Sequence, residues 1–186
     1  MGGRDGAGVM ISRRQALLGS GAGWLVRGSR AETAPGGHFE VTPVTLFLEG
    51  LDPEHEGLRV AQLSDVHVGM MTPDRQIRAA VEAVNALSPE LVVLTGDYVT
   101  TSVDPVEKVS ALLGGLERCG FSVLENQHTE LRLRHAPFRV IGVGDAVSHH
   151  EDVSASFRGC PARGSRLVLA HNPGTARRLP RGHGLL

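Results

Sequence analysis

Asp65 and His67 are two side chains that could together bind a metal ion. They follow the apolar run 58–63 (LRVAQL), whose length and branched residues predict a buried strand. Residues two apart point to the same side of an extended chain, so the carboxylate and the imidazole should converge at the strand end. Such donors suit a borderline divalent cation. The pattern is equally compatible with a capping aspartate and a solvated loop histidine.

The next segment predicts a strand–helix–strand unit that brings a third candidate to the same place. Apolar residues at helical spacing between Pro73 and Ser88 predict an amphipathic helix, and the run 91–94 (LVVL) predicts a strand buried on both faces. A short unit of this kind makes the two strands parallel. The second strand ends at Gly96-Asp97. Asp97 is therefore expected at the same sheet edge as the first pair, where sites of α/β sheets gather.

The remaining pattern predicts further elements and a fourth candidate. A helix is expected over 105–116, and strands are expected over 39–48, 121–124, 131–133, 138–143 and 166–170. The last strand ends at His171, and Asn172 is placed to cap a following helix. The polar cluster 149–152 (HHED) is expected to form a solvated loop, although it has metal-binding side chains.

Composition excludes several classes of protein. The 186 residues are enough for one ordinary core. Lys and Arg number 19 against 20 Asp and Glu, so the composition lacks the excess of positive charge that is typical of nucleic-acid-binding proteins. Cys119 and Cys160 are the two cysteines and form no Cys-x-x-Cys pair, which excludes a thiolate zinc site. Whether these cysteines pair, and the oligomeric state, are left open by the sequence.

The first 35 residues have the pattern of a targeting segment rather than of a folded one. Residues 12–18 (SRRQALL) resemble the twin-arginine signal of bacterial export, a weakly apolar stretch follows to Val26, and small residues near Ala34 suit a signal peptidase. The apolar stretch is too short and too rich in glycine to span a bilayer. The domain organisation expected is therefore a signal segment over 1–35 and a folded domain over 38–186.

Taken together, the motifs resemble those of the calcineurin-like metallophosphoesterases, and more closely their exported bacterial branch of twin-arginine phosphodiesterases. Residues 64–69 (SDVHVG), 94–99 (LTGDYV) and 169–173 (LAHNP) are similar to the first, second and fourth motifs of that family. The resemblance implies an α/β fold of four layers, αββα, with two mixed sheets packed face to face. It also implies a two-metal centre of Mn, Fe or Zn. Asp65 and His67 would hold the first metal, Asp97 would bridge, and His171 would hold the second.

Two motifs of the family are missing. The third, Gly-Asn-His, should lie on a strand after the helix over 105–116. Compared with the family pattern, a strand and a helix of about 20–25 residues in total are missing at that point. Residues 126–128 (NQH) resemble it superficially, but match a later family segment better. The fifth, Gly-His-x-His, has no counterpart, and His183 is expected to be a tail residue. With these ligands missing, the chain is expected to hold one metal rather than two.

The resemblance leads to two functional hypotheses. The first is a metal-dependent phosphodiesterase or phosphatase that uses a metal-activated water and acts on a small or lipid-linked phosphoester. The second is a truncated or internally deleted relative that binds metal but is catalytically impaired, and the missing motifs favour it. An exported protein would be periplasmic or at the outer face of the cytoplasmic membrane, so association with a membrane surface is left open.

Overall fold

The computed structural model describes residues 9–13, 32–33, 40–46, 48, 50–67, 72–98 and 120–180. Their strands are β1 (Val9–Arg13), β2 (Glu32–Thr33), β3 (Glu40–Val41), β4 (Val60–Ser64), β5 (Leu91–Thr95), β6 (Phe121–Leu124), β7 (Gln127–Leu133), β8 (Ala136–Gly142) and β9 (Ser165–Leu169). Their helices are α1 (Asp74–Leu87), α3 (Val153–Phe157) and the 3-10 turns η1 (Pro53–His55) and η2 (Pro173–Arg178). The strands form one sheet in the order β4-β5-β1-β6, a second in the order β7-β8-β9, and the small pair β2-β3.

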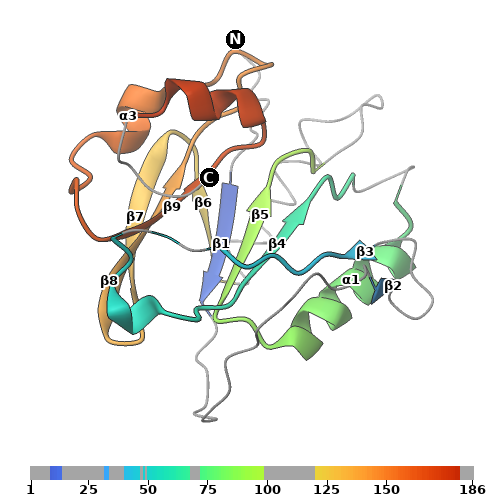
Figure 1. The fold of residues 1–186 in the computed structure, drawn as a ribbon. Helices are drawn as coiled ribbons and strands as arrows, with labels where there is room; N and C mark the ends of the chain where they lie inside the picture. Colours follow the sequence, from blue (N-terminus) through green and yellow to red (C-terminus); the bar gives the residue numbers. More distant parts are fainter. Residues whose placement is uncertain are drawn as a thin grey trace.

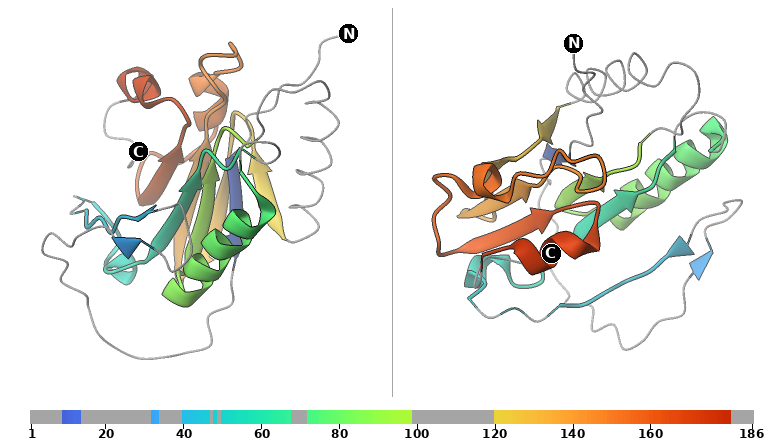
Figure 2. Two further views of the ribbon diagram at one scale, coloured as in Figure 1. Left: turned by 90° about the vertical axis from the view of Figure 1, so that its right-hand side faces the viewer. Right: turned by 90° about the horizontal axis from the view of Figure 1, so that it is seen from above.

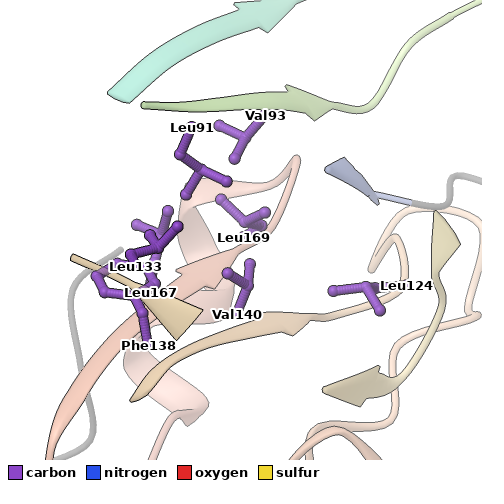
Figure 3. Packing of buried hydrophobic residues seen from close by; sticks show 8 residues of the cluster. All are labelled: Leu91, Val93, Leu124, Leu133, Phe138, Val140, Leu167 and Leu169. Atoms are coloured by element: carbon purple, nitrogen blue, oxygen red, sulfur yellow. The ribbon is translucent and has the colours of Figure 1, made fainter. Parts of the chain in front are cut away.

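The main core lies between the two larger sheets (Figure 3). Leu91 and Val93 project from β5 toward Val140 of β8 and Leu169 of β9, and these four side chains are almost completely buried. Leu133, Phe138, Leu167 and Leu124 extend the same cluster. All five residues of β5 are buried, as the continuous apolar run predicts for a strand covered on both faces. Burial of this apolar surface holds the two sheets face to face.

Helices cover the outer faces of the two sheets. Figures 1 and 2 show α1 beside β4 and β5, on the side away from the second sheet. On the far side, Val153 and Phe157 of α3 pack against Ile141 and Val168 of the second sheet. The α/β fold with two sheets and outer helices, expected from the sequence, is confirmed.

The pair β4–β5 has the predicted parallel direction, visible as two arrows pointing the same way in Figure 1. The register sets Val60 beside Leu91 and Ser64 beside Thr95, so the two strands end level. The intervening helix α1 ends at Leu87, and Ser88, its C-cap residue, takes the left-handed backbone conformation. Level ends of parallel strands bring the residues after Ser64 and after Thr95 to one edge of the sheet.

The N-terminal segment is paired into this first sheet, which the targeting pattern did not predict. Strand β1 runs antiparallel between β5 and β6, with Arg13 opposite Leu91 and Val9 opposite both Thr95 and Leu124 (Figure 1). Residues 9–13 and 32–33 therefore form strands within the segment expected to be a targeting signal, and the signal itself stays a prediction. Strand β1 lies beside β5, and the unpaired edge expected from the missing strand is filled.

Two other sequence expectations differ from the structure. Of the strand expected over 39–48, the described residues form a strand only at β3; residues 42–46 have no strand assignment, and Val44 and Leu46 are exposed. The strands expected over 131–133 and 138–143 are longer and form one hairpin, β7–β8. Its two-residue turn, Arg134-His135, has positive φ at both positions, the backbone of a type I′ turn, and lacks the usual Asn-Gly signal. The helix expected over 105–116 lies outside the described residues.

A buried histidine joins the segment before β4 to the second sheet. His55 is completely buried, with Nε2 3.0 Å from the Leu133 carbonyl and Nδ1 2.7 Å from Ser165 Oγ. A carbonyl only accepts, so Nε2 carries the proton and the Ser165 hydroxyl donates to Nδ1. The backbone N–H of Asp52 in turn donates to Ser165 Oγ at 3.0 Å. This chain of hydrogen bonds satisfies every polar atom of the buried ring.

An ion pair joins the two sheets at the end opposite the ends of β4 and β5. Arg134, in the β7–β8 turn, donates to both carboxylate oxygens of Glu90, just before β5. The same guanidinium donates to the carbonyls of Glu56 and Gly57. A forked Arg–carboxylate pair fixes orientation as well as distance. Arg134 therefore holds the start of β5, the chain before β4 and the β7–β8 hairpin together.

We expect this contact to lose its stabilising effect in acid. Burial raises the pKa of Glu90, but hydrogen bonds from Arg134 and the Arg59 backbone outweigh burial, so the pKa is lower than in an unfolded chain. A carboxyl with a lowered pKa stabilises the fold above its unfolded-state pKa, and this contribution is lost as the pH falls through the folded-state pKa. Glu90→Gln should therefore lower the free energy of unfolding at about pH 7 and have little effect at about pH 3 in urea titrations.

Glu82→Gln, on the exposed side of α1, is the matched control for loss of one carboxylate. It should change the free energy of unfolding little at either pH. An equal loss of stability for Glu90→Gln at both pH values would contradict the role given to the ion pair.

Candidate metal centre

The four ligands predicted from the sequence lie at the ends of three strands. Asp65 and His67 follow β4, Asp97 follows β5, and His171 follows β9. One ligand atom from each of Asp65, Asp97 and His171 lies within 4.8 Å of the others, and this is the one metal-type group of three among the described residues. His67 Nε2 is 3.3 Å from Asp97 Oδ2, so the fourth side chain lies beside the same group.

The backbone at this edge has an unusual conformation. Asp65, His67 and Asp97 have φ of 54°, 45° and 47°, in the left-handed region that non-glycine residues seldom occupy. A backbone hydrogen bond, from the His67 N–H to the Asp97 carbonyl at 3.1 Å, connects the two loops that carry the candidate ligands. Strained backbone of this kind persists only where surrounding contacts fix it, and it clusters at functional sites.

Gly96 makes room for His171. A Cβ built at Gly96 would lie 2.4 Å from His171 Cγ, and Gly96 itself has φ of +68°. His171 Nδ1 is 3.4 Å from the Thr95 carbonyl, a long hydrogen bond in which the nitrogen must donate. The proton is then on Nδ1, and the Nε2 lone pair remains for a metal. The glycine and the carbonyl together fix the position and the tautomer of this ligand.

Two hydroxyl groups hold the turn after β5. The Ser64 hydroxyl donates to the Thr95 carbonyl at 2.7 Å, across the β4–β5 pair. The Tyr98 hydroxyl donates to the Leu94 carbonyl at 2.9 Å and accepts from the Gly96 N–H at 3.1 Å. Burial raises the pKa of Tyr98 to about 12, against a smaller lowering by the Gly96 N–H. The phenol therefore stays protonated and remains a donor near neutral pH.

Asp145 is a charged neighbour of the site that the sequence assigned only to a turn. It follows β8, the strand parallel to β9. Burial raises its pKa, but hydrogen bonds from Ser148 and Val147, together with attraction to His171, lower it overall. The sequence carried one signal for Asp145: it is an acidic residue that follows a predicted strand, as Asp65 and Asp97 do.

Other candidates lie elsewhere. Asn126 is a structural clamp, because its Oδ1 accepts from the backbone of Gly144 and Asp152 and its Nδ2 donates to the His150 carbonyl. His128 contacts the Ser156 carbonyl through Nδ1, at 3.2 Å, and is not in the metal-type group. Neither residue therefore replaces the missing Gly-Asn-His motif.

In the cluster 149–152, His149 ends a turn and the other three residues have no regular secondary structure, as expected for a loop. Glu151 pairs with Arg178 at 2.7 Å and accepts from Thr175, while Asp152 caps α3. The described residues outside the site contribute no second group of metal-type side chains. Of the two cysteines, Cys160 has a free thiol, and burial raises its pKa above the ordinary value. Cys119 and His183 lie outside the described residues.

The donor set fits a divalent cation of the Mn, Fe or Zn type. Two carboxylates and two imidazoles supply the mixed oxygen and nitrogen ligands that these ions accept. Ligand atoms on opposite sides of one such ion are about 4–4.4 Å apart, so the observed spread requires only a small contraction. Fold and site together describe an α/β protein of two packed sheets with a cluster of Asp and His side chains at a sheet edge, where a metal ion could bind.

Comparison with known proteins gives relatives whose names describe phosphoester hydrolysis. A "Transmembrane protein with metallophosphoesterase domain" from Danio rerio is 25% identical over 178 aligned residues, which cover 74% of this chain and 40% of the relative. The UDP-2,3-diacylglucosamine pyrophosphatase LpxG of Chlamydia trachomatis is 36% identical over 61 residues, 32% of this chain and 18% of the relative. LpxG of Chlamydia muridarum is 42% identical over 43 residues, 23% of this chain and 13% of the relative.

These relatives support the metallophosphoesterase family and phosphoester hydrolysis in general, at low identity. No protein-family model and no solved structure matches the chain. The chain spans less than half the length of each of these three relatives. Among the described residues, no helix has the length and apolar character needed to cross a bilayer.

We expect Gly96→Ala to lower the affinity for Mn²⁺ by about tenfold or more, because the added methyl group must displace the His171 ring. Titration calorimetry measures this. Gly57→Ala is the matched control, since Gly57 has φ of +69° and nothing within 4 Å of the added Cβ. The two variants carry the same backbone cost, so only Gly96→Ala should lose metal affinity. Equal affinities would contradict the placement of His171.

Proposed function

We propose that this chain is a metal-dependent phosphoester hydrolase of the phosphodiesterase or phosphatase type. The observation that carries the proposal is the convergence of Asp65, Asp97 and His171, with His67 beside Asp97, at one edge of the fold. The names of the relatives support the same class of reaction. The exposure of Asp65 makes the site accessible to a phosphoester and to water.

Asp65, His67, Asp97 and His171 would hold the ion. A bound Mn, Fe or Zn ion supplies a Lewis acid for a phosphoryl oxygen and lowers the pKa of water. Asp97 belongs to the group with Asp65 and His171 and also contacts His67, so its carboxylate connects His67 to the other candidate ligands. His171 presents Nε2 because its Nδ1 donates to the Thr95 carbonyl.

A second candidate is a metal-binding relative with impaired catalysis. Strand β1 pairs antiparallel with β5, so Val9 lies beside Thr95 at the edge that carries the candidate ligands. The described part of β1 (VMISR) contributes neither the Asn nor the His of the missing Gly-Asn-His motif. A general acid that protonates a leaving group typically contributes 10²–10⁴-fold, as an order of magnitude, and no such residue has been identified here. We therefore expect slow turnover.

The substrate class and the location are part of the same proposal. The likeness to LpxG over 61 residues supports a lipid-linked or nucleotide-linked phosphoester rather than a nucleic acid. Export by the twin-arginine route would place the chain in the periplasm or at the outer face of the membrane. Such a location suits a substrate with a lipid part.

Titration calorimetry with Mn²⁺ should give about one site per chain, because four ligands suffice for one cation. Asp65→Ala should abolish this binding and the hydrolysis of an aryl phosphodiester, since the variant lacks one of the carboxylates of the group. His128→Ala is the control, because His128 contacts the Ser156 carbonyl and lies outside the group. Two tight metals per chain, or unchanged binding in Asp65→Ala, would contradict the single site.

Replacing Arg13 and Arg14 by Lys should leave the protein in the cytoplasm with an intact N-terminus, because the twin-arginine pattern would be lost while both charges remain. Cell fractionation followed by N-terminal sequencing measures the outcome. Replacing Arg177 and Arg178 by Lys changes another arginine pair and should leave export unaffected. Equal periplasmic recovery of the unchanged chain and the variant with both Arg13→Lys and Arg14→Lys would exclude the twin-arginine route.

A further inference from the structure

Tyr98 is a buried polar side chain next to a metal ligand, and the proposed chemistry does not use it. It is only 5% exposed, and its ring packs with Leu94 in a small cluster that also contacts Leu63, Phe121 and Val123. Its hydroxyl group turns back over the end of β5 and bonds to Leu94 and Gly96. The ring is therefore anchored in the core, while the hydroxyl reaches the turn that carries Asp97.

The directions of the two hydrogen bonds are fixed by their partners. The Leu94 carbonyl can only accept, so it takes the phenolic hydrogen, and the Gly96 N–H can only donate, so it points at the phenolic oxygen. Together the two bonds close a loop from Leu94 to Tyr98. Inside this loop lie the Thr95 carbonyl, which orients His171, and Asp97 itself.

The backbone inside the loop needs such a restraint. Gly96 and Asp97 have φ of 68° and 47°, so two consecutive residues are left-handed. That conformation is unfavourable for an aspartate, and it persists where neighbouring contacts over-determine it. The Ser64 hydroxyl restrains the Thr95 carbonyl, but of the two hydroxyls only that of Tyr98 bonds to Gly96.

We infer that Tyr98 is a positioning residue of the metal centre: its hydroxyl holds the Thr95–Asp97 turn so that Asp97 and His171 meet the same cation. This inference rests on the proposed metal-dependent function and deepens it. Tyr98 acts through the backbone, and the phenol is not assigned a contact with the metal or the substrate.

The first test compares Tyr98→Phe with a matched variant elsewhere. Ser165→Ala also removes one buried hydroxyl with two hydrogen bonds, at the start of β9, the opposite end of that strand from His171. Co²⁺ is the probe, because its visible absorption reports ligand geometry. Tyr98→Phe should weaken Co²⁺ binding about 10–100-fold, the usual effect of losing a residue that orients a ligand, and change the absorption bands. Ser165→Ala should lower the melting temperature and leave affinity and spectrum unchanged.

The second test uses the unsubstituted chain, in case Tyr98→Phe does not fold. Tyr98 is the only tyrosine, so 3-fluorotyrosine gives a single ¹⁹F resonance from this residue. Zn²⁺ should shift this resonance in the wild-type chain and leave it unmoved in Asp97→Asn. A ¹⁹F chemical shift that does not change with Zn²⁺, while calorimetry shows Zn²⁺ binding, would overturn the inference.

The outcomes also separate this inference from the proposed function. If the wild-type chain binds Co²⁺ and Tyr98→Phe binds it with equal affinity and spectrum, the positioning role is wrong and the metal centre stands. If the wild-type chain binds none of Mn²⁺, Zn²⁺ and Co²⁺, the proposed function is wrong and this inference is overturned with it.

Discussion

The rest of the structure depends on the burial and pairing of β5. One face of this strand supplies Leu91 and Val93 to the core between the sheets, and its two edges pair with β4 and β1. Because β4 and β5 are parallel and end level, the residues that follow them meet at one edge. A shift of register by one residue would turn every side chain of a strand to the opposite face. The metal centre is therefore fixed by the same contacts that hold the core.

The backbone of the candidate site is strained, and hydrogen bonds restrain it. Three of its ligands take left-handed backbone conformations, and hydrogen bonds within the edge hold them there. The Ser64 and Tyr98 hydroxyls both bond to the turn after β5, and Gly96 leaves space for His171. The side chains that could bind a cation are thus positioned largely by backbone contacts, and these contacts connect the site to the buried cluster around Tyr98.

Strand β1 covers the edge of β5 that faces away from β4. An unpaired edge there would expose backbone donors and acceptors in the middle of a sheet. The segment 9–13 pairs with this edge and also with β6. Its residues, VMISR, include no His, Cys, Asp or Glu, so β1 completes the hydrogen bonding of the sheet without adding a candidate ligand.

The sequence by itself determined the strand ends and the candidate ligands that follow them. Runs such as LVVL and the polar residues after them are local patterns, and parallel pairing follows from the short unit between β4 and β5, so Asp65, His67, Asp97 and His171 could all be predicted. Only the tertiary structure decided the placement of β1, the I′ turn at Arg134-His135 and the bond of His55 to Ser165, 110 residues away. Such contacts leave no periodic signal, because they depend on which distant groups meet once the core has closed. The hydrogen bonds of the Tyr98 hydroxyl to Leu94 and Gly96 are local in sequence, yet the hydroxyl points toward them because the ring packs against residues of β4 and β6.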